Sequence, residues 1–209
     1  MSYTFQIASH ASEDRLEKLI EERLKPGANT ELIDQRIWDL FGEEWAIMFT
    51  DLSGFSRQVA QFGIIHFLQI IYESQRILVP VIDDHDGILL KLEGDSMLVI
   101  FRRASKALEC SINMQRKVKE YNVGKAETDK ILLCIGLGVG KVLRIGDSDV
   151  FGAEVNASSK LGEDTAKAWE ILVTRNVMEA VKGLPDVSFE KIDEVPPGAD
   201  SAFKTIYKL

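Results

Sequence analysis

Residues 45–54 read WAIMFTDLSG, and residues 88–101 read ILLKLEGDSMLVIF. The first stretch is a short apolar run that stops at Asp51, which is typical of a buried strand followed by a turn. The second contains two apolar runs joined by a short polar turn, in which Gly94 supplies the backbone freedom that a hairpin needs. These patterns predict one strand and one β-hairpin, with Asp51 and Asp95 each at the end of a strand.

Between and after these stretches, apolar residues recur at helical spacing. This spacing predicts two successive helices from Ser56 to about Asp84, broken near Gly63, and another helix from Ala104 to Tyr121. The order βααβ followed by βαβ predicts an α+β, ferredoxin-like domain whose central, mostly antiparallel sheet carries helices on one face. The remaining predicted elements are strands at 131–139 and 141–145 and terminal strands at 188–193 and 203–207. Three further segments, 152–161, 169–173 and 175–181, complete the domain without a type assigned to them.

The first 43 residues have a pattern of their own. Helical spacing predicts a helix from Glu13 to Leu24 and a second short helix capped by Asn29 or Thr30. We therefore divide the chain into an N-terminal helical extension, 1–43, and a domain that spans 44–209. We interpret the extension as a helical cover for the core, in preference to a dimer-forming or signal-receiving element.

The composition excludes several classes of function. The chain has 33 acidic and 25 basic residues and a formal charge of -8, which argues against binding to nucleic acid or to an anionic membrane. Its two cysteines, Cys110 and Cys134, each lie in an apolar stretch and are too few for a disulfide framework. No apolar run approaches the roughly 20 residues that cross a bilayer. We therefore expect a cytoplasmic protein without a membrane segment.

The two aspartates at strand ends are candidate metal ligands. Asp51 and Asp95 both lie beside glycine turns, and hard divalent cations such as Mg²⁺ prefer carboxylate oxygens in such open positions. A single aspartate of this kind is more often an ordinary turn residue. The presence of both sites together favours a site for two metal ions.

Three ordered segments carry a family resemblance. Residues 49–56, FTDLSGFS, and residues 91–95, KLEGD, resemble the two metal-binding signatures of class III adenylate and guanylate cyclases. Residues 149–161, DVFGAEVNASSKL, resemble the segment of that family that reads the base and stabilises the transition state. The similarity runs from about Trp45 to the C-terminus. The order and spacing of the three segments therefore identify a catalytic homology domain of this family.

The resemblance implies a site for two Mg²⁺ or Mn²⁺ ions at Asp51, Leu52 and Asp95. It also implies a head-to-tail homodimer, in which the metal-binding residues of one subunit face the base-binding residues of the other. The implied reaction converts ATP to 3′,5′-cyclic AMP and pyrophosphate by attack of the ribose 3′-hydroxyl on the α-phosphate. We expect the backbone N–H groups around Gly54, Phe55 and Ser56 to bind a phosphate, because they open a predicted helix.

ATP is the expected substrate because a lysine donates to adenine N1 and an aspartate accepts from the N6 amine. Lys91 and Asp149 match the positions that adenylate cyclases use in this way, whereas guanylate cyclases carry an acidic residue and a small or thiol residue there. Taken singly, each residue also has an ordinary structural interpretation: Lys91 as a surface lysine and Asp149 as a turn aspartate. An active cyclase with another base preference is therefore left open.

Other positions depart from the family pattern. Asn156 matches the asparagine that orients the ribose, but Lys160 stands where the family has an arginine over the α-phosphate. A lysine is a flexible point charge and does not reproduce the planar fork of an arginine. Cys134 and Pro196 stand where many members have cationic residues that bind phosphate. These departures favour an alternative function, a catalytically weak or inactive cyclase-like module for nucleotide binding, regulation and dimerisation.

Overall fold

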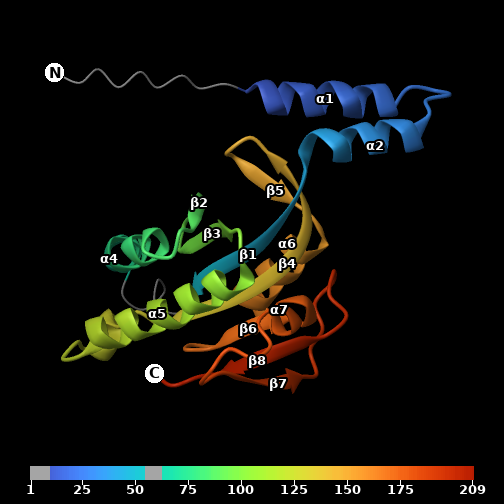
Figure 1. The fold of residues 1–209 in the computed structure, drawn as a ribbon. Coiled ribbons are helices and arrows are strands. Elements are labelled where there is room, and N and C mark those ends of the chain that lie inside the picture. The colour runs from blue at the N-terminus through green and yellow to red at the C-terminus, as the bar shows by residue number, and fades with distance from the viewer. Residues whose placement is uncertain (1–9, 55–62) are drawn as a thin grey trace.

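The computed structural model describes residues 10–54 and 63–209. Its centre is an eight-stranded sheet in the order β2-β3-β1-β4-β6-β8-β7, and β5 pairs with residues 143–145 of β4 (Figure 1). Neighbouring strands are antiparallel except for β4 and β6, which are parallel. The strands are β1 Gly42–Leu52, β2 Ile88–Glu93, β3 Ser96–Phe101, β4 Leu133–Ile145, β5 Asp149–Phe151, β6 Ile171–Thr174, β7 Ser188–Ile192 and β8 Ala202–Ile206. The α+β prediction is confirmed.

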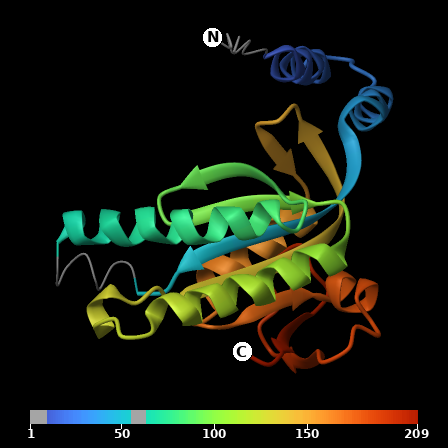
Figure 2. The same cartoon turned by 60° about the vertical axis from the view of Figure 1, so that its left-hand side comes forward.

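Helices cover the sheet on both faces. Figure 2 shows α4 and α5 running along the same face, where alternate β1 residues such as Met48 enter the main core with Leu78 and Leu108. The prediction that only one face carries helices was wrong, because α6 packs on the opposite face through Val155 beside Ile47. The helices are α1 Ala11–Arg23, α2 Thr30–Phe41, α4 Ile64–Asp83, α5 Ala104–Asn122, α6 Ala153–Ser159 and α7 Arg175–Ala180, with a 3₁₀ turn at Glu127–Asp129 and a π-helical segment at Lys160–Thr165.

Most predicted elements are present with shifted ends. The two strands expected at 131–139 and 141–145 are one long strand, β4, because its register with β1 continues through Gly140. The second of the two helices predicted before Asp84 is α4, and the first lies largely outside the described residues. The hairpin at Gly94 and the helix from Ala104 are as expected.

The N-terminal helices pack against the far end of β4. Leu19 of α1 and Ile37 of α2 form a small core with Ile145, and Asn29 caps α2 by accepting a hydrogen bond from Leu32 N at 3.1 Å. The two helices thus form a small core that is separate from the main one. Their role as a cover and the division of the chain at residue 43 both stay predictions. None of the helices in the described part of the chain is both long and apolar enough to cross a membrane.

Candidate active site

The two predicted metal-binding carboxylates lie next to each other. Asp51 is at the end of β1. Asp95 is in the turn between β2 and β3, and β3 is the strand that pairs with β1. Antiparallel pairing aligns Thr50 with Met97, so the two strand ends meet, and Ser96 Oγ donates to Asp51 Oδ1 at 3.3 Å. Burial and the adjacent negative charge of Asp95 raise the pKa of Asp51 to about 7.

These carboxylates fit a divalent cation. Two hard oxygen donors close together repel each other, and burial disfavours the charge of Asp51, so a cation between them would relieve both effects. Within residues 10–54 and 63–209, no group of three or more His, Cys, Asp or Glu side chains forms a complete metal site. Metal binding here would therefore need further oxygen ligands, such as the phosphates of a nucleotide.

The predicted base-reading residues contact each other directly. Lys91 of β2 donates to Asp149 of β5 across 2.5 Å, although 58 residues separate them in the chain. Both side chains line a cavity of about 120 Å³ with Phe49, Leu98 and other residues of the neighbouring strands. A hydrogen-bond donor and an acceptor thus lie side by side at the wall of a small cavity, and such a pair can complement the edge of a nucleotide base.

The predicted ribose and phosphate residues lie on one exposed surface. Asn156 of α6 and Lys160, at the start of the π-helical segment, are four residues apart and exposed. The Lys160 ammonium forms an ion pair with Asp164 at 2.5 Å, which raises the pKa of Lys160. Among the described residues, no hydrogen bond or ion pair joins Asn156 or Lys160 to the carboxylates or to the Lys91–Asp149 pair.

The glycines of β4 explain how α6 is held so close to the sheet. A Cβ on Gly136 would lie 2.1 Å from Ser158 O, and one on Gly138 would lie 2.6 Å from Glu154 O. Both distances are shorter than real Cβ contacts, so only glycine allows the helix backbone to rest on the strand. The glycine-rich strand thus serves the placement of α6 and its Asn156.

A family model described as "Adenylate and Guanylate cyclase catalytic domain" matches residues 42–204. The chain belongs to this family.

Two curated relatives are similar to parts of the cyclase domain. The "Putative adenylate cyclase 3" of Rhizobium meliloti (strain 1021) is 28% identical over 144 residues, which are 69% of this chain and 24% of the relative. The serine/threonine-protein kinase pkn2 of Myxococcus xanthus is 28% identical over 131 residues, which are 63% of this chain and 16% of the kinase. The chain thus spans a quarter or less of the relatives that it matches.

Solved structures agree on the fold. The adenylate/guanylate cyclase/hydrolase from Silicibacter pomeroyi superposes with a TM-score of 0.69 at 21% identity, covering 80% of this chain and 98% of that one. The adenylyl cyclase CyaB from P. aeruginosa gives 0.65 at 16% identity and covers 80% and 96%, respectively. The guanylate cyclase domain of RhGC from Catenaria anguillulae gives 0.64 at 15% identity and covers 80% and 98%. Adenylate and guanylate cyclases share this fold, so the fold alone does not determine which nucleotide base is bound.

The remaining residues predicted for the site differ in their burial and in whether the structure describes them. Gly54 is exposed in the turn after β1 at φ 90°, whereas Phe55 and Ser56 lie outside the described residues. Leu52 is buried at the end of β1. Cys134 is also buried, and its burial, together with the nearby Asp51, raises the pKa of its thiol to about 12. The thiol is therefore neutral and does not replace a phosphate-binding cation.

Sequence reasoning missed Glu163. It lines the same cavity as Lys91 and Asp149, accepts a hydrogen bond from Ser159 Oγ, and its negative charge helps to raise the pKa of Asp51. Its position follows from the π-helical segment, which a helical pattern of apolar residues does not reveal. Its closeness to Asp51 depends on the packing of that segment against β1.

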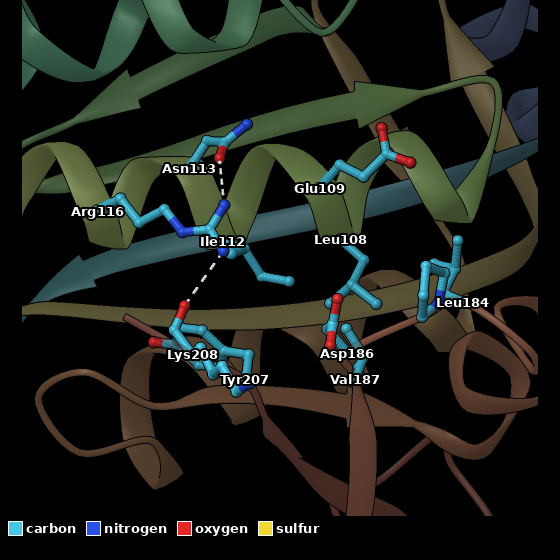
Figure 3. Close-up of a pocket in the computed structure, with 11 residues that line it drawn as sticks. Leu108, Glu109, Ile112, Asn113, Arg116, Leu184, Asp186, Val187, Tyr207 and Lys208 are labelled. Carbon is cyan, nitrogen blue, oxygen red and sulfur yellow. Dashed lines mark hydrogen bonds between the residues drawn. The ribbon is translucent and has the colours of Figure 1, made fainter.

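A separate cavity of about 470 Å³ lies between α5 and the last strands (Figure 3). Leu108 and Ile112 face it from α5, and Tyr207 closes its other side. Arg116 is already engaged there, donating to Asn113 Oδ1 and to the backbone oxygen of Lys208, each at 3.1 Å. None of the predicted site residues lines this cavity, so it is not part of the candidate active site.

Proposed function

We propose that the protein is a nucleotidyl cyclase that converts ATP to 3′,5′-cyclic AMP and pyrophosphate at a head-to-tail homodimer interface. The contact between Lys91 and Asp149 carries this proposal. A lysine donor and an aspartate acceptor side by side match adenine, which offers an acceptor at N1 and a donor at N6. Both side chains must exchange their mutual ion pair for the base when ATP binds.

The metal-binding part of the proposal rests on Asp51 and Asp95. Two Mg²⁺ or Mn²⁺ ions, when bound, would increase the acidity of the ribose 3′-hydroxyl and offset the charge of the phosphates. Asp51 holds its charge at neutral pH less readily than an ordinary aspartate, since burial raises its pKa. The part of the two carboxylates is to fix the ions beside the triphosphate, while Gly54 at the turn leaves its backbone open to a phosphate.

The reaction forms a bond between the 3′-oxygen and the α-phosphorus. The bond from that phosphorus to the bridging oxygen breaks, pyrophosphate leaves with the electron pair, and the hydroxyl proton is released. We assign Asn156 to the ribose and Lys160 to the charge that develops on the α-phosphate. Both are exposed, which supports a site completed by the carboxylates of a second copy.

A second candidate function is a cyclase-like module that binds nucleotide and acts through dimerisation with little or no turnover. Two observations favour it. The Lys160 ammonium is already paired with Asp164, and the buried, protonated Cys134 supplies no positive charge for a phosphate. Lysine in place of arginine also loses the planar pair of donors that a phosphate accepts.

The test measures cyclic AMP made from ATP with Mn²⁺ at several protein concentrations. The intact protein is compared with Asp51→Ala and Asp95→Ala, and Asp193→Ala serves as the control because it removes an exposed aspartate outside the site. The proposal predicts product that is lost in the first two variants only and whose rate rises faster than linearly with protein concentration. Competition among the four nucleoside triphosphates tests the base preference. Retained nucleotide binding with no product from any of them would instead support the second candidate.

A further inference from the structure

Glu154 is a buried carboxylate that none of the chemistry above uses. It lies in the first turn of α6, two residues before Asn156, and is only 7% exposed. Burial raises its pKa, against the opposing effect of its hydrogen bonds. Removing a carboxylate from water is unfavourable, so a residue of this kind in a core calls for a specific role.

Three donors from three different elements bind this carboxylate. Val139 N of β4 donates to Oε2 at 3.1 Å, and Thr174 Oγ1, at the end of β6, donates to the same oxygen at 2.7 Å. Asn176 Nδ2 of α7 donates to Oε1 at 2.6 Å. Glu154 therefore ties the start of α6 to a central strand, to its parallel neighbour and to the helix that follows.

The surface beneath α6 makes such a tie necessary. Gly138 and Gly140 flank Val139, and a Cβ at either position would lie within 3.0 Å of Glu154 atoms. Side chains normally interlock to fix how a helix sits on its neighbour, but glycines present no side chains to interlock. A strand lined with glycine lets α6 approach closely, and beyond the packing of Val155 against Ile47 few interlocking side chains define the position of α6 along the strand. Directional hydrogen bonds supply that definition instead.

We infer that Glu154 is a positioning residue that fixes α6 on the glycine-rich strand and thereby places Asn156 and Lys160 for the reaction. This inference rests on the proposed function, since the two residues have catalytic roles only in an active cyclase. Lys91, Asp149, Asp51 and Asp95 lie on other elements. Loss of the Glu154 contacts is therefore expected to disturb the chemical step more than the capture of the nucleotide.

The experiment compares four variants of the full chain. Glu154→Ala removes all three hydrogen bonds, Thr174→Val removes one while keeping the shape of the side chain, and Glu154→Gln keeps an acceptor that the amide of Asn176 can complement by turning over. Glu179→Ala is the control, because it removes an exposed carboxylate from α7. Steady-state kinetics with ATP and Mn²⁺ are measured together with hydrogen exchange of the backbone amides.

We expect Glu154→Ala to lower kcat by about 30-fold while KM for ATP changes less than about threefold. The reason is that a displacement of a catalytic group by about 1 Å lowers the rate by up to roughly 100-fold. Thr174→Val gives a smaller loss, Glu154→Gln restores most of kcat, and Glu179→Ala changes nothing. Exchange at the Val139 amide becomes at least about tenfold faster in Glu154→Ala only.

Two results would overturn the inference. One is an unchanged kcat in Glu154→Ala, and the other is a Glu154→Gln variant as impaired as Glu154→Ala. If the intact protein makes no cyclic nucleotide, the proposed function fails, and hydrogen exchange then decides the inference alone. Unaltered exchange at Val139 and across residues 153–159 in Glu154→Ala would show that Glu154 does not hold α6.

Discussion

A single methyl group added at Gly136 is expected to displace the α6 backbone from the sheet. In Gly136→Ala the new Cβ would lie 2.1 Å from Ser158 O and 2.4 Å from Gly162 N, both of which are backbone atoms. Ordinary contact begins at 3.4 Å, so the segment must move by about 1.3 Å. Gly136 itself cannot retreat, because it is paired with Phe49 on one side and Leu172 on the other.

The displacement is expected to lower both the stability of the protein and its kcat. Overpacking of this size costs about 2 kcal/mol, which corresponds to a fall in Tm of about 4–8 °C for a chain of this length. Because Asn156 and Lys160 move with the helix, kcat falls by about 100-fold. KM for ATP changes little, since Lys91 and Asp149 lie on β2 and β5.

Thermal unfolding and steady-state kinetics check both magnitudes. Gly140→Ala is the matched control, because its Cβ would meet no backbone atom. Its neighbours would be the side-chain Cγ and Cβ of Glu154 at 3.0 and 3.9 Å, and a shift of a few tenths of an ångström relieves the closer contact. We expect it to lower kcat by less than about fivefold. The reasoning is refuted if Gly136→Ala retains the Tm and the kcat of the unmodified protein.

Three further predictions concern other parts of the protein. Mn²⁺ affinity, measured by calorimetry in the presence of a saturating ATP analogue that cannot be cyclised, is expected to rise about tenfold between pH 6 and 8. The reason is that the pKa of Asp51 is raised to about 7 and the ion binds the deprotonated carboxylate. In the metal-free protein, the stability linked to this raised pKa is present at low pH and is lost as the pH rises through about 7. Asn122→Ala is expected to lower the free energy of unfolding in urea by about 2–4 kcal/mol, since it removes both hydrogen bonds to the buried backbone of Ile131, at 2.9 and 2.7 Å. Lys91→Glu combined with Asp149→Cys is expected to shift the ratio of kcat/KM for ATP and GTP by about tenfold or more towards GTP, measured by competition, because it replaces the adenine-matched pair.

Each of these predictions has a control. Asp51→Asn should remove most of the pH dependence of metal binding, and a dependence that persists would contradict the assignment to Asp51. Lys117→Ala, at an exposed site on the same helix as Asn122, should change the unfolding free energy by less than about 0.5 kcal/mol. An unaltered ATP preference in the double variant would show that the base is read elsewhere.

Prediction from sequence was most accurate where structure is local. The hairpin at Gly94 and the N-cap at Asn29 depend on a few adjacent residues, and both are as expected. The break predicted within β4 was wrong, because strand pairing with β1 carries the chain through Gly140 despite its weak strand propensity. The coverage of the second sheet face was missed because the helical pattern of α6 does not reveal which face it packs against.

The sequence by itself determined most of the strands and turns and named the candidate site residues, because alternation, glycine turns and the three family segments are encoded in neighbouring residues. Only the tertiary structure decided which distant residues meet. Lys91 pairs with Asp149, Glu163 approaches Asp51, and Glu154 gathers donors from three elements. These contacts depend on the order and register of the strands, which are set by the packing of the whole core and leave no local periodic signal.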